Sequence, residues 1–187
     1  MTAKRSYFVL EKYETTILGF QTHIYIMRLN TNYYCKQNCT IKRGKDFVKK
    51  CVMDNLYLFK LLTLNKVSAT KLYKNDPNLM KQIKKIMDPS YVYTYCLNKN
   101  TLIFAETTSP HHKSYIKNWL SKHVMLCDNS TCASGEAVIH NNRFVFDNMS
   151  GTFTPHLSKL YILKKILPTI KIVNWDSPIR DKIFKNY

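Results

Sequence analysis

Glycine is scarce in this chain: only four of its 187 residues are glycine, at positions 19, 44, 135 and 151. Several common ligand-binding motifs need closely spaced glycines, because the backbone must approach a phosphate or present a strained nucleophile. The P-loop, the dinucleotide-binding G-x-G-x-x-G turn and the G-x-S-x-G elbow are therefore all absent, as is the zinc-binding H-E-x-x-H. The usual nucleotide hydrolases, Rossmann proteins and α/β-hydrolases are excluded.

The length and composition fit one folded domain. Hydrophobic residues make up 45% of the chain and aromatic residues 13%, which is enough to build a sizeable core and too much for a disordered chain. We expect a single domain over residues 1–187. The alternative is a division near 88–91 into a basic N-terminal part (1–90) and a C-terminal α+β part (91–187).

The sequence predicts an intracellular protein. No apolar run approaches the roughly 18–20 residues that span a bilayer, and Glu11, Lys12 and Glu14 interrupt the N-terminal hydrophobic stretch. We therefore expect neither a transmembrane segment nor a secretion signal. In the reducing interior of a cell, or of a particle assembled there, the six cysteines are expected to be free thiols.

A zinc site is the weaker alternative for the cysteines. Two pairs, Cys35 with Cys39 and Cys127 with Cys132, offer four thiolates if their loops meet. Their spacing is wider than the C-x2-C of zinc knuckles, and the pairs are far apart in the chain. We therefore expect no metal and no other cofactor.

Proline signals predict most of the helices. Where proline follows aspartate, serine or threonine, the first residue caps a helix and proline fits its first turn. A helical repeat of apolar residues also begins after Asp46. Asp88-Pro89 has the same form but precedes a strand-like run, so it predicts a turn. The predicted helices are 47–62, 77–87, 110–121, 155–167 and 178–185.

Runs of β-branched and aromatic residues predict the strands. Two short polar segments, 97–100 and 141–142, separate neighbouring runs as hairpin turns do. The resulting fold class is α+β, an antiparallel sheet with helices packed on one face. The predicted strands are 7–10, 22–29, 91–96, 101–105, 124–127, 136–140, 144–146 and 169–173.

The charge predicts a polyanionic partner. There are 29 basic and 12 acidic residues, which give a net charge of +17, and such a field attracts nucleic acid or an acidic protein surface. AT-rich codons would explain many lysines but not the shortage of acids. The residues expected to contact a polyanion lie in one loop and on one predicted helix: Lys42, Arg43, Lys45, Lys81, Lys84 and Lys85.

Two predicted helix starts carry candidate anion-binding residues, because backbone N–H groups there attract anions. The first start has His111, His112, Lys113 and Ser114; its alternative is an exposed turn without a ligand. The second follows a strand and holds Asn148, Ser150, Gly151 and Thr152. Its alternative is a tight turn in which the Asn148 amide and the Ser150 hydroxyl only satisfy the backbone.

The segment 91–173 resembles an uncharacterised small domain that recurs in giant DNA viruses and in some bacterial proteins. Its pattern is H-H-S, then A-G-E at a strand start, then N-x-S-G-H/T-Y-x-P entering a helix. The matching residues are 111–114, 134–136 and 148–155. Here Lys113 interrupts the first motif, Ser134 replaces alanine and Phe153 replaces tyrosine.

The resemblance implies a viral origin, with a location in the host cytoplasm, the nucleus or the virion. It also suggests that Gly135 starts a strand and that Gly151 ends the returning segment of the same hairpin. The two glycines would then flank one surface.

Three functions follow. The first is binding of nucleic acid or an acidic partner. The second is a small metal-independent enzyme acting on a phosphorylated or nucleotide-like substrate. In it His112 is the general acid/base, Glu136 orients or deprotonates, and Ser150 holds anionic oxygens. The third is a structural component of a virion.

Overall fold

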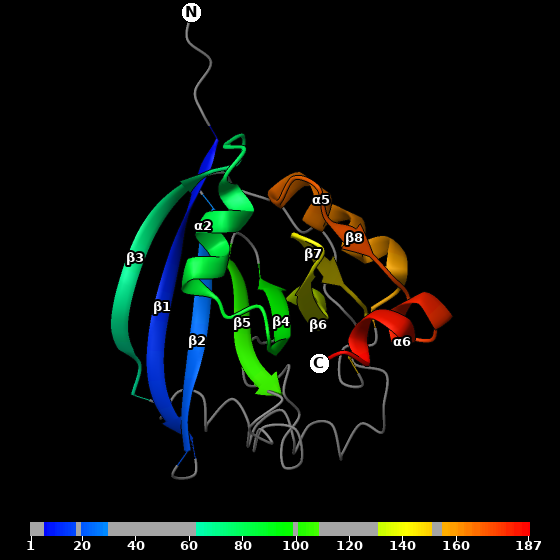
Figure 1. Ribbon diagram of the computed structural model, residues 1–187, viewed down its shortest axis with the longest axis horizontal. Helices are drawn as coiled ribbons and strands as arrows, with labels where there is room; N and C mark the ends of the chain where they lie inside the picture. The colour runs from blue at the N-terminus through cyan, green and yellow to red at the C-terminus, as the bar shows by residue number, and fades with distance from the viewer. Residues whose placement is uncertain (1–5, 18–19, 30–62, 99–100, 109–130, 151–154) are drawn as a thin grey trace, which may run out of the picture.

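One mixed sheet dominates the computed structural model, which describes residues 6–17, 20–29, 63–98, 101–108, 131–150 and 155–187 (Figure 1). In this part of the chain eight strands follow the order β3-β1-β2-β5-β4-β6-β7-β8. The strands are β1 (Tyr7–Ile17), β2 (Phe20–Leu29), β3 (Asn65–Tyr73), β4 (Val92–Asn98), β5 (Thr101–Thr108), β6 (Thr131–His140), β7 (Arg143–Phe146) and β8 (Lys171–Ile172). The helical segments are α2 (Leu79–Ile86), the 3-10 helix η1 (Leu157–Ile162), α5 (Leu163–Ile166) and α6 (Pro178–Phe184).

The α+β class is confirmed, but the purely antiparallel sheet is wrong. Strands β7 and β8 pair in parallel, whereas every other described pair is antiparallel. The chain passes through η1 and α5 between β7 and β8, and such a crossover returns it to the sheet in the same direction. Residues on both sides of 88–91 belong to this sheet, because β2 pairs with β5.

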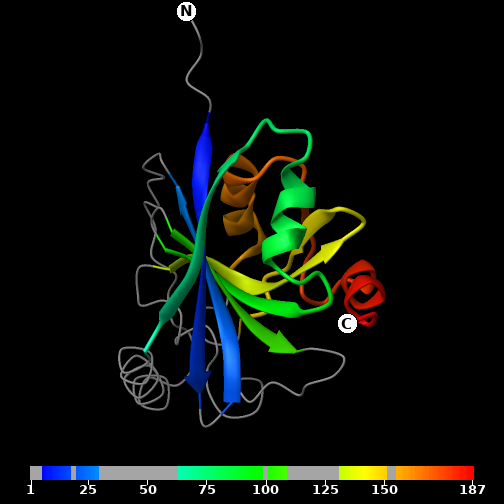
Figure 2. The same ribbon diagram turned by 60° about the vertical axis from the view of Figure 1, so that its left-hand side comes forward.

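The helices do not all pack on one face, which corrects the second half of the fold prediction. Side chains alternate between the faces of a strand. Phe144 and Phe146 therefore join the main core, against which α2, η1 and α5 pack. Val145, between them, points to the opposite face and meets Ile183 and Phe184 of α6. Figure 2 shows α2 and α5 beside each other on their shared side of the sheet.

The proline signals at three positions mark real elements. Helix α6 begins at Pro178, and the Ser177 hydroxyl accepts a hydrogen bond from the amide of Ile179 at 3.3 Å. Helix α2 begins two residues after Pro77, and η1 two residues after Pro155. Asp88-Pro89 forms the expected turn, in which the Asp88 carboxylate accepts from the amide of Ser90 at 2.9 Å.

Strand β3 was not predicted, and its position explains why. It forms one edge of the sheet among the described strands, and five of its nine residues are exposed. Its sequence therefore lacks the apolar alternation of a half-buried strand. The predicted helices 47–62 and 110–121 and the predicted strand 124–127 lie outside the described residues.

The β6–β7 hairpin has the turn that its sequence suggests. Asn141 and Asn142 have φ angles of 50° and 59°, and asparagine is one of the few residues that adopt such angles readily. None of the helices within the described ranges has the length and apolar character to cross a bilayer.

Candidate functional site

Gly135 lies in the middle of β6 and not at its start, which corrects the sequence expectation. A Cβ atom at this position would lie 2.1 Å from the backbone oxygen of Asp147. The two segments are joined closely here: the Asp147 amide donates to the Glu136 carbonyl at 2.9 Å, and the Glu136 amide donates to Asp147 Oδ1 at 2.7 Å. Glycine is therefore required by the close approach of two backbones.

Arg180 of α6 joins two carboxylates at this junction. Its Nε atom lies 3.0 Å from Asp147 Oδ2, and its Nη2 atom lies 3.2 Å from Glu136 Oε2. Burial and the Glu136 carboxylate raise the pKa of Asp147 to about 6, against the opposing effect of hydrogen bonds from two amides and Arg180. At neutral pH Asp147 is ionised and binds Arg180.

These contacts pair the Glu136 carboxylate with the Arg180 guanidinium. The Glu136 carboxylate does line a cavity of about 330 Å³ together with Arg180, Phe184 and Tyr187. Its Oε2 atom also lies 3.2 Å from Arg180 Nη2. The Arg180 contacts hold α6 against the sheet.

Asn148 uses both ends of its amide to bind backbone. Its Nδ2 donates to the Pro155 carbonyl at 3.1 Å, and its Oδ1 accepts from the Trp175 amide at 2.8 Å. The Asn148 side chain thus ties the end of the β6–β7 unit to the segments before η1 and α6. Ser150 is buried beside it, and Gly151 and Thr152 lie outside the described residues.

Replacing Asn148 with alanine is expected to lower the free energy of unfolding by about 2 kcal/mol, because the buried Pro155 carbonyl and the part-buried Trp175 amide lose their partner. Urea denaturation measures this loss. Asn75→Ala, at an exposed position before α2, is the control and should change stability by less than about 0.5 kcal/mol. An Asn148→Ala protein as stable as the control would show that the side chain does not serve the backbone.

Several predicted residues lie outside the described part of the chain. They are His111, His112, Lys113, Ser114, Lys42, Arg43, Lys45, Cys35, Cys39 and Cys127. Cys132 belongs to β6. Within the described ranges, no group of three or more His, Cys, Asp or Glu residues is arranged to hold a metal ion.

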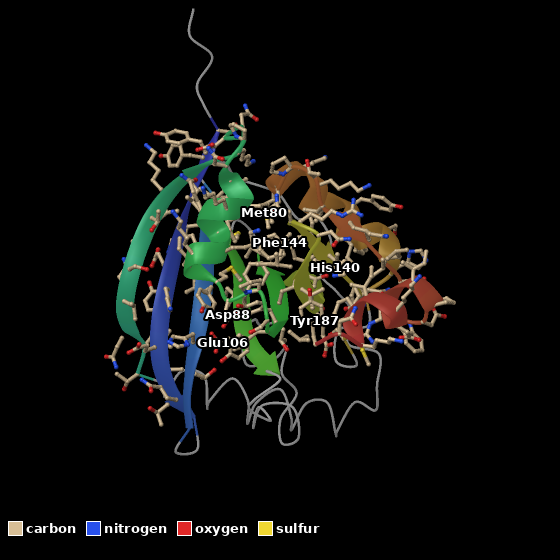
Figure 3. All side chains as sticks on the ribbon, in the orientation of Figure 1. Met80, Asp88, Glu106, His140, Phe144 and Tyr187 are labelled. Atoms are coloured by element: carbon tan, nitrogen blue, oxygen red, sulfur yellow. The ribbon has the colours of Figure 1, made fainter. Side chains whose placement is uncertain are left out.

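A second pocket lies between the sheet and the C-terminal end of α2, and we call it the α2 pocket. It has a volume of about 410 Å³. Figure 3 labels two of its residues, Glu106 and Asp88, near this end of the helix. Its lining is Lys12, His23, Tyr25, Lys84, Lys85, Ile86, Asp88, Pro89, Tyr91 and Glu106.

Glu106 is the central polar group of the α2 pocket. Its side chain is 9% exposed. Its Oε1 atom accepts a hydrogen bond from the Tyr25 hydroxyl at 2.9 Å and lies 3.1 Å from His23 Nδ1. Burial raises the pKa of the Glu106 carboxyl, and His23 and Tyr25 oppose the rise. Burial also raises the pKa of Tyr25, so its hydroxyl keeps the proton that it donates.

Glu106 differs from the other buried carboxylates of the described residues, Glu11 and Asp147. Glu11 binds Arg28 Nε at 2.5 Å and lies 3.5 Å from Lys66 Nζ. Asp147 binds Arg180. Among the described residues, Glu106 pairs with no arginine or lysine. A buried carboxylate without such a partner, in a cavity, is typical of a ligand-binding or catalytic group.

Lysines surround this carboxylate. Lys84 and Lys85 are exposed on α2, and Lys12 reaches over the Tyr25 ring, with Nζ 5.9 Å from the ring centroid. The sequence predicted Lys84 and Lys85 as anion contacts but missed His23 and Glu106. Their signal was weak: each is a charged or polar residue at an inward position of an otherwise apolar strand.

Comparison with known proteins finds no family model, no curated protein and no solved structure that significantly matches this chain.

Proposed function

We propose that the protein binds single-stranded nucleic acid through the exposed lysines of α2 and the surface beside them. The proposal rests on the exposure of Lys81, Lys84 and Lys85 and on their lack of an ion pair among the described residues. All three are exposed on one short helix. Among the described residues, no carboxylate forms an ion pair with any of them. Their charges are therefore available to a partner.

The overall charge supports a polyanion as that partner. A net charge of +17 draws phosphate backbones to the protein over long distances, and lysines that contact phosphates release counterions. Three lysines within two turns of a helix give this attraction a local contact surface.

The neighbouring helices favour a single strand over a duplex. Tyr161 of η1 is 53% exposed, and Lys164 of the adjoining α5 lies over its ring, with Nζ 5.0 Å from the centroid. Proteins that bind single strands combine basic side chains with exposed aromatic rings on which bases stack. Helix α5 lies beside α2 (Figure 2), so both features belong to one side of the molecule.

The test is the salt dependence of binding to a labelled single-stranded oligonucleotide, measured by fluorescence anisotropy. We expect the double variant Lys84→Gln/Lys85→Gln to bind more weakly and to reduce the slope of log K against log salt by roughly 1–1.5, since each phosphate contact with a single strand contributes about 0.7. The reason is the loss of two phosphate contacts.

The control is Lys182→Gln/Lys185→Gln, which removes the same charge from exposed positions of α6 and just after it, on the opposite face of the sheet. This variant should keep the wild-type slope. Equal losses in both variants would show that binding depends only on net charge, and no binding by the wild-type protein would contradict nucleic acid as the partner.

A further inference from the structure

The α2 pocket combines groups that a simple contact with a phosphate backbone does not need. We propose that it binds a sugar phosphate, either free or as the phosphorylated end of a nucleic acid strand. The phosphate lies at Lys84 and Lys85, and a sugar hydroxyl donates to Glu106. This inference rests on the proposed function in one respect, because both assign phosphate contacts to these two lysines.

Glu106 presents one carboxylate oxygen to a ligand in the pocket. Its Oε1 atom is occupied by the Tyr25 hydroxyl and by His23. Its Oε2 atom receives no hydrogen bond from the described residues. This oxygen is not among the buried side-chain atoms that lack a partner, so it is open to the pocket, where a ligand hydroxyl can donate to it in place of water.

The charges around the pocket exclude a bare anion as the best ligand. Lys12, Lys84 and Lys85 attract a phosphate, but Glu106 and Asp88 repel it, and so do the carbonyl groups at the C-terminal end of α2. Asp88 is held in its turn by the amide and hydroxyl of Ser90, so it does not move to a lysine. A ligand that presents a phosphate to the lysines and a hydroxyl to Glu106 satisfies both kinds of group.

The remaining lining suits a sugar. Tyr91 lines the pocket with Ile86 and Pro89, and its partly buried ring offers apolar surface against which the carbon–hydrogen face of a sugar packs. A volume of about 410 Å³ lies in the range of small-molecule sites, which combine apolar walls with a few placed polar groups.

The first experiment is calorimetric titration of the whole protein with ribose 5-phosphate, ribose and inorganic phosphate. We expect ribose 5-phosphate to bind about tenfold tighter than inorganic phosphate or more, the size of effect of a hydrogen bond to a charged group. Ribose should bind too weakly to detect. Equal affinities for ribose 5-phosphate and phosphate would overturn the proposal, as would binding of neither.

Variants then assign the preference to its residue. In Glu106→Gln the preference for ribose 5-phosphate over phosphate should fall to near onefold, while phosphate itself binds at least as well because a negative charge is gone. In Lys84→Gln/Lys85→Gln both ligands should weaken together. An unchanged preference in Glu106→Gln would contradict the role of the carboxylate.

Two RNA oligonucleotides, one with a 5′ phosphate and one with a 5′ hydroxyl, distinguish this inference from the proposed function and also distinguish the two sources of the ligand. RNA is used because the first ribose keeps a 2′-hydroxyl that can donate to Glu106. A preference for the phosphorylated end that Glu106→Gln abolishes assigns the pocket to strand ends. Ribose 5-phosphate binding with equal affinity for both strands assigns it to free sugar phosphates. If both strands bind equally and ribose 5-phosphate does not bind, the inference fails and the proposed function stands. If only ribose 5-phosphate binds, the proposed function fails.

Discussion

Replacing Gly135 with alanine is expected to prevent the protein from folding stably. The added Cβ would meet the backbone oxygen of Asp147 at 2.1 Å and its backbone carbon at 2.8 Å. Both atoms belong to backbone held by hydrogen bonds to Glu136, so neither yields as the end of a flexible side chain would. We expect a loss of several kcal/mol, seen as a lost or greatly lowered thermal transition by circular dichroism.

Ser134→Ala is the matched control, because it places the same residue one position earlier in β6. The Ser134 hydroxyl is buried and has no hydrogen-bond partner among the residues that the structure describes, so its removal should leave stability unchanged or slightly increased. A Gly135→Ala protein that melts like Ser134→Ala would contradict the close approach of the two backbones.

The second large effect is expected for Arg180→Met. This change removes the cation from Asp147 and Glu136, of which Asp147 is fully buried. Removing one partner of a buried ion pair costs about 3–5 kcal/mol. Urea denaturation at neutral pH measures the loss. Lys182→Met, two residues further along α6 and exposed, is the control and should lie within about 0.5 kcal/mol of the wild type.

The stability that Arg180→Met loses relative to the wild type should be smaller at acidic pH than at neutral pH. The pKa of Asp147 is about 6 with Arg180 present, and loss of the arginine moves the folded-state pKa higher. This folded-state pKa then lies above the pKa of an aspartate in the unfolded chain, about 3.9. The destabilisation from the buried carboxylate is therefore largest above the folded-state pKa, and it declines as the pH falls from there toward the unfolded-state value. The variant should therefore be closer to the wild type at pH 5 than at pH 7.5; an equal or larger deficit at pH 5 would contradict the account.

Local signals predicted the local parts of this fold. The caps before Pro178 and the asparagine turn at 141–142 depend on neighbouring residues alone, and both are present. The parallel pairing of β7 with β8 depends on where η1 and α5 return the chain, which no local pattern records. Edge strand β3 was missed because hydrogen bonds to β1 hold it and burial of its side chains contributes little.

The candidate site was less predictable because its residues meet only through the sheet. Tyr25 and Glu106 are 81 positions apart, and the antiparallel pairing of β2 with β5 brings them together. Arg180 and Glu136 are separated by 44 positions. Reading short motifs favoured Glu136 and Asn148 as functional residues, whereas their side chains contact Arg180 and backbone groups. The lysines of α2 could be proposed from the sequence because charge and helical spacing are both local.

We have proposed that phosphates bind at the α2 pocket and at the lysines beside it. Amide chemical shifts of the isotope-labelled protein, followed while a 5′-phosphorylated single-stranded oligonucleotide is added, test it most directly. We expect the changes to concentrate in β1, β2 and the C-terminal half of α2, around Lys12, His23 and Lys84, with further changes in η1 and α5 where bases stack on Tyr161. Changes centred on α6, or spread evenly over every lysine, would contradict the claim.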